Sequence, residues 1–60
     1  MSHFLDIKGR IADLEAILEE YEAGLSKAEA ENDTAEIQFF RQQIEAIKNQ
    51  IDGLKNSPNF

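Results

Sequence analysis

The chain has 60 residues, no cysteine, and twelve acidic against six basic side chains, which give a net charge of -6. A chain this short forms one domain at most and buries only about 60% of the surface that its unfolded form exposes. The composition excludes disulfide bonds, and the net charge disfavours nucleic acid and anionic membranes as partners. We therefore expect a weakly stable domain that is completed by self-association or by docking on a protein partner.

Apolar runs are short throughout the sequence. The longest uninterrupted aliphatic run is Ala16, Ile17 and Leu18. Such a run is too short for the core of a signal peptide or for a membrane span. The expected location is the cytoplasm, or a virion assembled there, and no membrane partner is expected.

The first half of the chain carries a heptad seam, which we define as apolar residues that follow one another at alternating steps of three and four. The seam residues of this half are Phe4, Ile7, Ile11, Leu14, Leu18, Tyr21, Leu25 and Ala28. An apolar stripe with this period predicts a long amphipathic helix over about residues 3–31.

The second half repeats the same alternation. Its seam residues are Ile37, Phe40, Ile44, Ile47, Ile51 and Leu54. They predict a second helix over about residues 34–56, and Ser57 and Pro58 predict its end because the residue before a proline disfavours the helical conformation. Residues 57–60 remain as a tail.

The two seams are out of phase by two residues. A continuous helix would carry the first seam on through positions 32, 35, 39 and 42, whereas the second seam uses 37, 40, 44 and 47. Two residues correspond to about 200° around a helix, so a straight rod would present the two stripes on nearly opposite faces. An antiparallel hairpin lets the stripes meet, and the fold class predicted is therefore an all-α, coiled-coil-like two-helix hairpin.

Local signals place the break between the helices at residues 32–33. Asp33 followed by Glu36 matches a capping box that starts a new helix. Asn32 tolerates the left-handed backbone conformation that commonly ends a helix. The sequence therefore predicts one turn and a single hairpin domain over residues 1–60.

The antiparallel register that starts from this turn gives each seam residue an apolar partner. The predicted pairs are Ala28 with Ile37, Leu25 with Phe40, Tyr21 with Ile44, Leu18 with Ile47, Leu14 with Ile51, and Ile11 with Leu54. The predicted flanking contacts are Glu22 near Arg41, Glu15 near Lys48, and the unfavourable Lys8 near Lys55. The same register places Phe60 of the tail near Phe4.

Six residues outside the seams are predicted to contact other proteins. Gly9, Ala16, Ala23 and Ala30 form a row of small residues farthest from the first seam, where an exposed helix more often carries charge. Ile17 and Phe39 lie beside the seams and widen the apolar surface. The alternative reading of the row is that alanine is simply the best helix former.

Candidate chemistry is sparse in this sequence. Glu19, Glu20 and Glu22 point in different directions around one helix, which is typical of a solvated acidic face and not of paired catalytic carboxylates. Tyr21 is a seam residue, and His3 is the only imidazole. We expect no catalytic residues, no metal or other cofactor, and no small-molecule substrate.

In size and layout the chain resembles the repressor-of-primer family of plasmid proteins, helical hairpins that pair into four-helix bundles and bind paired RNA hairpins. The resemblance is architectural, carries no binding residues across, and implies an RNA-binding dimer as a minor alternative. The function expected is a non-enzymatic structural or accessory subunit that packs into a larger assembly, such as a phage virion or another multiprotein machine. The alternative is a small regulatory adaptor, inhibitor or chaperone that binds one protein.

Overall fold

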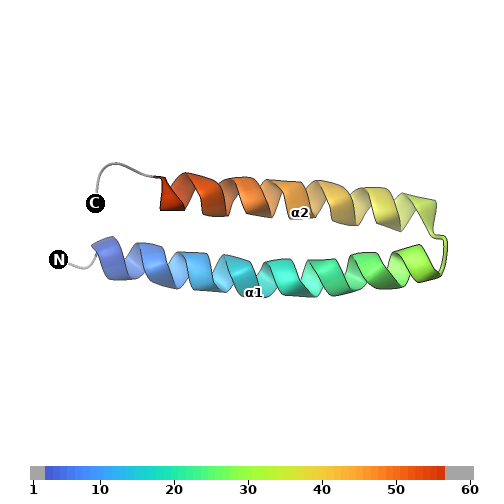
Figure 1. Cartoon of the computed structure of the whole chain (residues 1–60), viewed down its shortest axis with the longest axis horizontal. Helices are drawn as coiled ribbons and strands as arrows, with labels where there is room; N and C mark the ends of the chain where they lie inside the picture. The colour runs from blue at the N-terminus through green and yellow to red at the C-terminus, as the bar shows by residue number, and fades with distance from the viewer. Residues whose placement is uncertain (1–2, 57–60) are drawn as a thin grey trace.

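The protein is a two-helix antiparallel hairpin. The computed structural model describes the backbone of residues 3–56 and the side chains of residues 6–56. Helix α1 spans His3–Ala30 and helix α2 spans Thr34–Lys55. The helices lie side by side and pack against each other along their length (Figure 1). This is the all-α hairpin that the two seams predict, whereas the predicted contact between Phe60 and Phe4 lies outside the described side chains.

The core is the line along which the two seams meet. A buried cluster of Leu14, Ile47 and Ile51 lies at its centre, with Ile11, Leu18, Tyr21 and Leu54 packed against it. This cluster contains both members of three predicted pairs: Leu14 with Ile51, Leu18 with Ile47, and Ile11 with Leu54. Each seam residue from Ile7 to Leu54 is buried or half-buried. The alternation of three and four steps therefore describes the face that each helix turns to the other.

In the turn, backbone hydrogen bonds end α1 and one side chain caps the N-terminus of α2. Asn32 has a φ of 57°, in the left-handed region. The Asp33 N–H donates to the Ala28 carbonyl at 3.0 Å and the Asn32 N–H donates to the Glu29 carbonyl at 3.2 Å, which is the hydrogen-bond pattern of a Schellman motif. Asp33 then caps α2, because its Oδ1 accepts from the Glu36 N–H at 3.2 Å.

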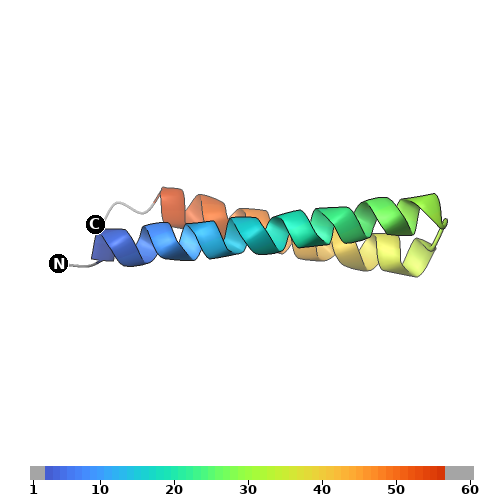
Figure 2. The same ribbon diagram turned by 90° about the horizontal axis from the view of Figure 1, so that it is seen from below.

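The hairpin is long and thin. Its principal extents are 47, 16 and 10 Å and its radius of gyration is 14.1 Å, compared with about 10 Å for a compact chain of this length. Figure 2 shows the helices crossing at a shallow angle, as in coiled-coil packing. A pair of helices has only one internal interface, so each helix presents an outer face that its partner helix does not cover.

Candidate protein-interaction site

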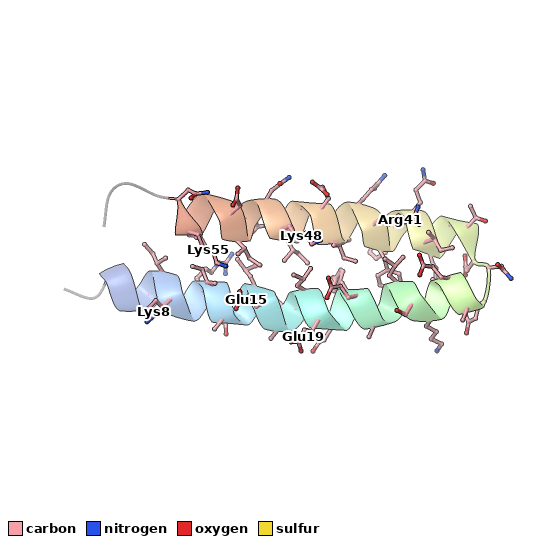
Figure 3. All side chains as sticks on the ribbon, viewed as in Figure 1. Lys8, Glu15, Glu19, Arg41, Lys48 and Lys55 are labelled. Atoms are coloured by element: carbon pink, nitrogen blue, oxygen red, sulfur yellow. The ribbon has the colours of Figure 1, made fainter. Side chains whose placement is uncertain are left out.

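One side of the hairpin, which we call the charged flank, carries charged residues that each directly follow a seam residue. These residues are Lys8, Glu15, Glu22 and Glu29 of α1 and Arg41, Lys48 and Lys55 of α2. Arg41 Nη2 lies 3.4 Å from Glu29 Oε2, and Lys55 Nζ lies 3.8 Å from Glu15 Oε2. In Figure 3, Glu15 and Lys55 point toward one another from facing helices, whereas Glu19 lies on the side of α1 away from α2.

The partners on this flank differ from the predicted ones by one heptad. Arg41 contacts Glu29 and not the predicted Glu22, and the lysine that contacts Glu15 is Lys55 and not the predicted Lys48. Each flanking residue lies between two flanking residues of the facing helix, and long side chains can reach either one. The observed choice also turns Lys55 toward a carboxylate, whereas the predicted register set it beside Lys8.

These ion pairs contribute little stability. Their side chains are 49% to 66% exposed to solvent, and ion pairs with this exposure are worth about 0–1 kcal/mol each. The charged flank carries four basic and three acidic side chains, a net charge of +1, so the net negative charge of the hairpin lies elsewhere.

An open groove of about 220 Å³ lies on the same flank. It is lined by Glu15, Leu18, Lys48, Ile51, Asp52 and Lys55. Two lysines and two carboxylates balance one another in this lining, and the two aliphatic residues already belong to the seam. The groove therefore offers no uncompensated charge to a ligand.

The opposite side of the hairpin, which we call the aromatic flank, is built around Phe40. Its ring lies edge-on to Tyr21, with ring centroids 5.9 Å apart, and edge-on to Phe39, with centroids 5.4 Å apart. The ring also lies over Gly24, where a β-carbon would stand 2.7 Å from the Cε1 and Cζ atoms of Phe40. Gly24 therefore supplies the space for this ring, a role that the sequence pattern alone does not reveal.

Ile17 and Phe39, two of the residues predicted to contact other proteins, are exposed on this aromatic flank. Ile17 is 40% exposed and Phe39 is 49% exposed. Gly24 follows Ile17 by one heptad, so both lie in the same column of α1. Because Phe40 covers Gly24 and contacts Phe39, the exposed apolar residues of the two helices lie on one side of the hairpin.

The predicted row of small residues lies along the outer face of α1. Gly9, Ala16, Ala23 and Ala30 are all exposed. Within the described part of the chain, nothing beyond the two chain neighbours and the backbone of α1 lies within 4 Å of a β-carbon built at Gly9. Ala16 and Ile17 are consecutive and point about 100° apart around α1, with the exposed acids Asp13 and Glu20 between them. The row and Ile17 are therefore separate parts of the α1 surface, and Phe39 lies on α2.

A second outer surface was missed by the sequence interpretation. We call it the uncharged face of α2, and it consists of Phe39, Gln42, Gln43, Ala46, Asn49, Gln50 and Gly53. Gln43 is half-buried and the others are exposed. The signal that reveals this face is the absence of charge at positions repeating with the helical period, in a chain that is 30% charged.

The described part of the chain contains few features that suggest chemistry. Glu19, Glu20 and Glu22 are exposed to solvent, as expected for a solvated acidic face. Among the side chains of residues 6–56, no three potential metal ligands are grouped so that they would hold an ion. Neither described helix has an apolar stretch long enough to cross a bilayer.

Comparisons of the chain with protein-family models, with curated proteins and with solved structures found no match.

Proposed function

We propose that the protein is a non-enzymatic structural or accessory subunit that packs through its outer helical faces into a larger protein assembly, such as a phage virion. The observation that carries this proposal is that Ile17 and Phe39 stay exposed after the seam between the helices is complete. Large apolar side chains gathered on one side of a small protein are typical of a surface that another protein covers. The row of small residues on the outer face of α1 allows a partner helix to approach that helix closely.

The slender shape supports the same proposal. A hairpin has one thin core, and the buried side chains of its described part are Leu14, Ala28, Ile44, Ile47 and Ile51. Burial of the outer faces against neighbouring proteins adds the apolar contact that a chain of this size lacks by itself. The minor alternative of RNA binding has less support, because Arg41 and Lys55 contact carboxylates of their own chain.

Affinity capture of the tagged full chain from its native source, followed by mass spectrometry, tests the proposal. We expect several proteins of one assembly in fixed proportion, whereas recovery of one soluble partner in a one-to-one complex would favour the regulatory alternative. The variants Ala16→Glu, Ala23→Glu and Ile17→Asp place charges on the proposed contact surface and should reduce recovery at least about tenfold. Gln38→Glu is the control, because it adds a negative charge at an exposed residue of α2 outside the proposed contact residues.

If all three variants recover the same proteins as the wild-type chain, the row and Ile17 are not a contact surface and the proposal is wrong. Helical content measured by circular dichroism separates a loss of recovery caused by charge on the contact surface from one caused by unfolding, because replacing alanine by glutamate keeps a good helix former.

A further inference from the structure

We infer that the uncharged face of α2 binds a second copy of this chain, so that two hairpins pair antiparallel through α2 about a two-fold axis near Ala46. The inference rests on the proposal that the hairpin is an assembling subunit, and it names one of its partners. Three properties of the described residues carry it: the periodicity of the face, the distribution of charge, and the sizes of the side chains.

The periodicity is that of a second helix-packing seam. Phe39, Gln43, Ala46, Gln50 and Gly53 follow one another at steps of four and three, which is the spacing that keeps residues in line with a partner helix. The exposed amide side chains of Gln42 and Asn49 border this seam on the side away from α1. Glu45 and Asp52 lie farther round the helix, outside the surface that a packed helix covers.

The distribution of charge selects this face for a second copy. Each chain has a net charge of -6, so two copies repel one another wherever acidic surfaces meet. The outer surface of α1 carries Asp13, Glu19 and Glu20, all exposed, and pairing there would bring acids together. None of the seven residues of the uncharged face of α2 carries a formal charge, and the charged residues of the same segment lie outside this face. Two copies therefore meet there without this repulsion.

The sizes of the side chains make the face self-complementary. Phe39 is large and 49% exposed at the turn end of α2, whereas Ala46 and Gly53 follow in the same column at one and two heptads. Among the described residues, a β-carbon at Gly53 would have nothing within 4 Å beyond its two chain neighbours and its own helix backbone. In an antiparallel pair, each Phe39 ring lies against the space above Ala46 and Gly53 of the second copy, and the two-fold axis makes the contact twice.

The exposed area agrees with a dimer of this kind. The chain exposes 4559 Å², whereas a compact monomer of its mass exposes about 4,000 Å². The excess, 4559 minus about 4,000 or about 560 Å², is about two thirds of the roughly 800 Å² that each partner buries in a standard protein–protein interface. Pairing through one helical face would therefore bring the area exposed by each chain close to that of an ordinary globular protein.

Sedimentation equilibrium of the isolated full chain, from micromolar to millimolar concentration, tests the inference. We expect a monomer–dimer equilibrium whose dissociation constant rises at least about tenfold in Ala46→Glu, because two carboxylates then face each other at the centre of the contact. Ala12→Glu adds the same charge on α1 and should leave the constant within about twofold of the wild-type value. A wild-type chain that stays monomeric to millimolar concentration, or equal effects of the two variants, would overturn the inference.

Single cysteines test the antiparallel arrangement, because the natural sequence has none. Ala46→Cys lies near the proposed two-fold axis and should form a disulfide between two chains under mild oxidation. Gly53→Cys lies about 10 Å along the helix from that axis, so two such residues stand apart and should link much more slowly. Equal linking of the two variants would contradict an antiparallel pair.

The same variants separate this inference from the proposed function. A chain that stays monomeric but captures other proteins through Ala16 and Ala23 would contradict the dimer and still support the proposed function. A dimer that is broken by Ala46→Glu but captures no other protein would support the dimer and contradict the larger assembly.

Discussion

The ring of Phe40 lies so close to Gly24 that a β-carbon at residue 24 would stand 2.7 Å from two of its ring atoms. This contact joins the turn-proximal halves of the two helices on the aromatic flank. It also gives a physical reason for a glycine inside α1, where glycine costs about 1 kcal/mol relative to alanine.

Gly24→Ala should therefore fail to give the stability that helix propensity predicts. The added methyl group displaces Phe40 from its edge-on contacts with Tyr21 and Phe39. Gly9→Ala is the matched control, because a β-carbon built at Gly9 has no described group within 4 Å beyond its chain neighbours and helix backbone. This variant should raise the free energy of unfolding by about 0.5–1 kcal/mol. Urea unfolding at low protein concentration compares the two, and equal gains would mean that the ring shifts at no cost.

Two isoleucines of contrasting burial should respond differently to truncation. Ile51 is 8% exposed in the central cluster, so Ile51→Ala should lower the free energy of unfolding by about 2–3 kcal/mol. Ile17 is 40% exposed, so Ile17→Ala should change it by less than about 0.5 kcal/mol. Circular dichroism at 222 nm during urea unfolding of dilute protein measures both values. Similar losses would show that the aromatic flank is part of the core.

The turn should be sensitive to the residue that adopts the left-handed conformation. Asn32→Ala keeps a β-carbon at a φ of 57° and removes the polar side chain that makes asparagine more tolerant of this conformation, and it should cost about 1 kcal/mol. Asn32→Gly removes the steric cost and should be neutral or stabilising. Thermal unfolding of the two variants provides the comparison, and the prediction is wrong if alanine is tolerated as well as glycine.

The cap of α2 should contribute separately. Asp33→Ala removes the oxygen that accepts from the Glu36 N–H at 3.2 Å, and should cost about 1 kcal/mol. Asp33→Asn keeps an acceptor and should recover most of this loss, which distinguishes capping from a purely electrostatic effect on the helix terminus. If asparagine and alanine are equally destabilising, the hydrogen bond is not the cause.

Proximity of Glu15 and Lys55 within one chain distinguishes the hairpin from an extended rod that exchanges helices between chains. Their charged groups lie 3.8 Å apart, so cysteines at both positions should react with a short bifunctional maleimide to give a crosslinked monomer in dilute solution. Covalent dimers as the main product would instead indicate exchanged helices. Glu19→Cys with Lys55→Cys is the matched control, since Glu19 points away from α2 (Figure 3).

The sequence by itself determined the helices, the hairpin and the turn. Seam spacing identifies the buried face of each helix, because a period of three and four aligns residues along one side of a helix. Asn32 and Asp33 mark the break through interactions with backbone groups within five residues of themselves. Signals of such short range do not depend on the rest of the fold.

Only the tertiary structure decided which long side chains meet on the charged flank and that Gly24 makes room for the Phe40 ring. Glu22 and Glu29 each directly follow a seam residue, and the Arg41 side chain is long enough to reach either one. Heptad position therefore does not predict that Arg41 contacts Glu29. The role of Gly24 depends on the side toward which the Phe40 ring leans, which is set by Tyr21 and Phe39 together. In both cases the physical reason is that rotamers of long or aromatic side chains are chosen by neighbours on the other helix, which the order of residues along one helix does not specify.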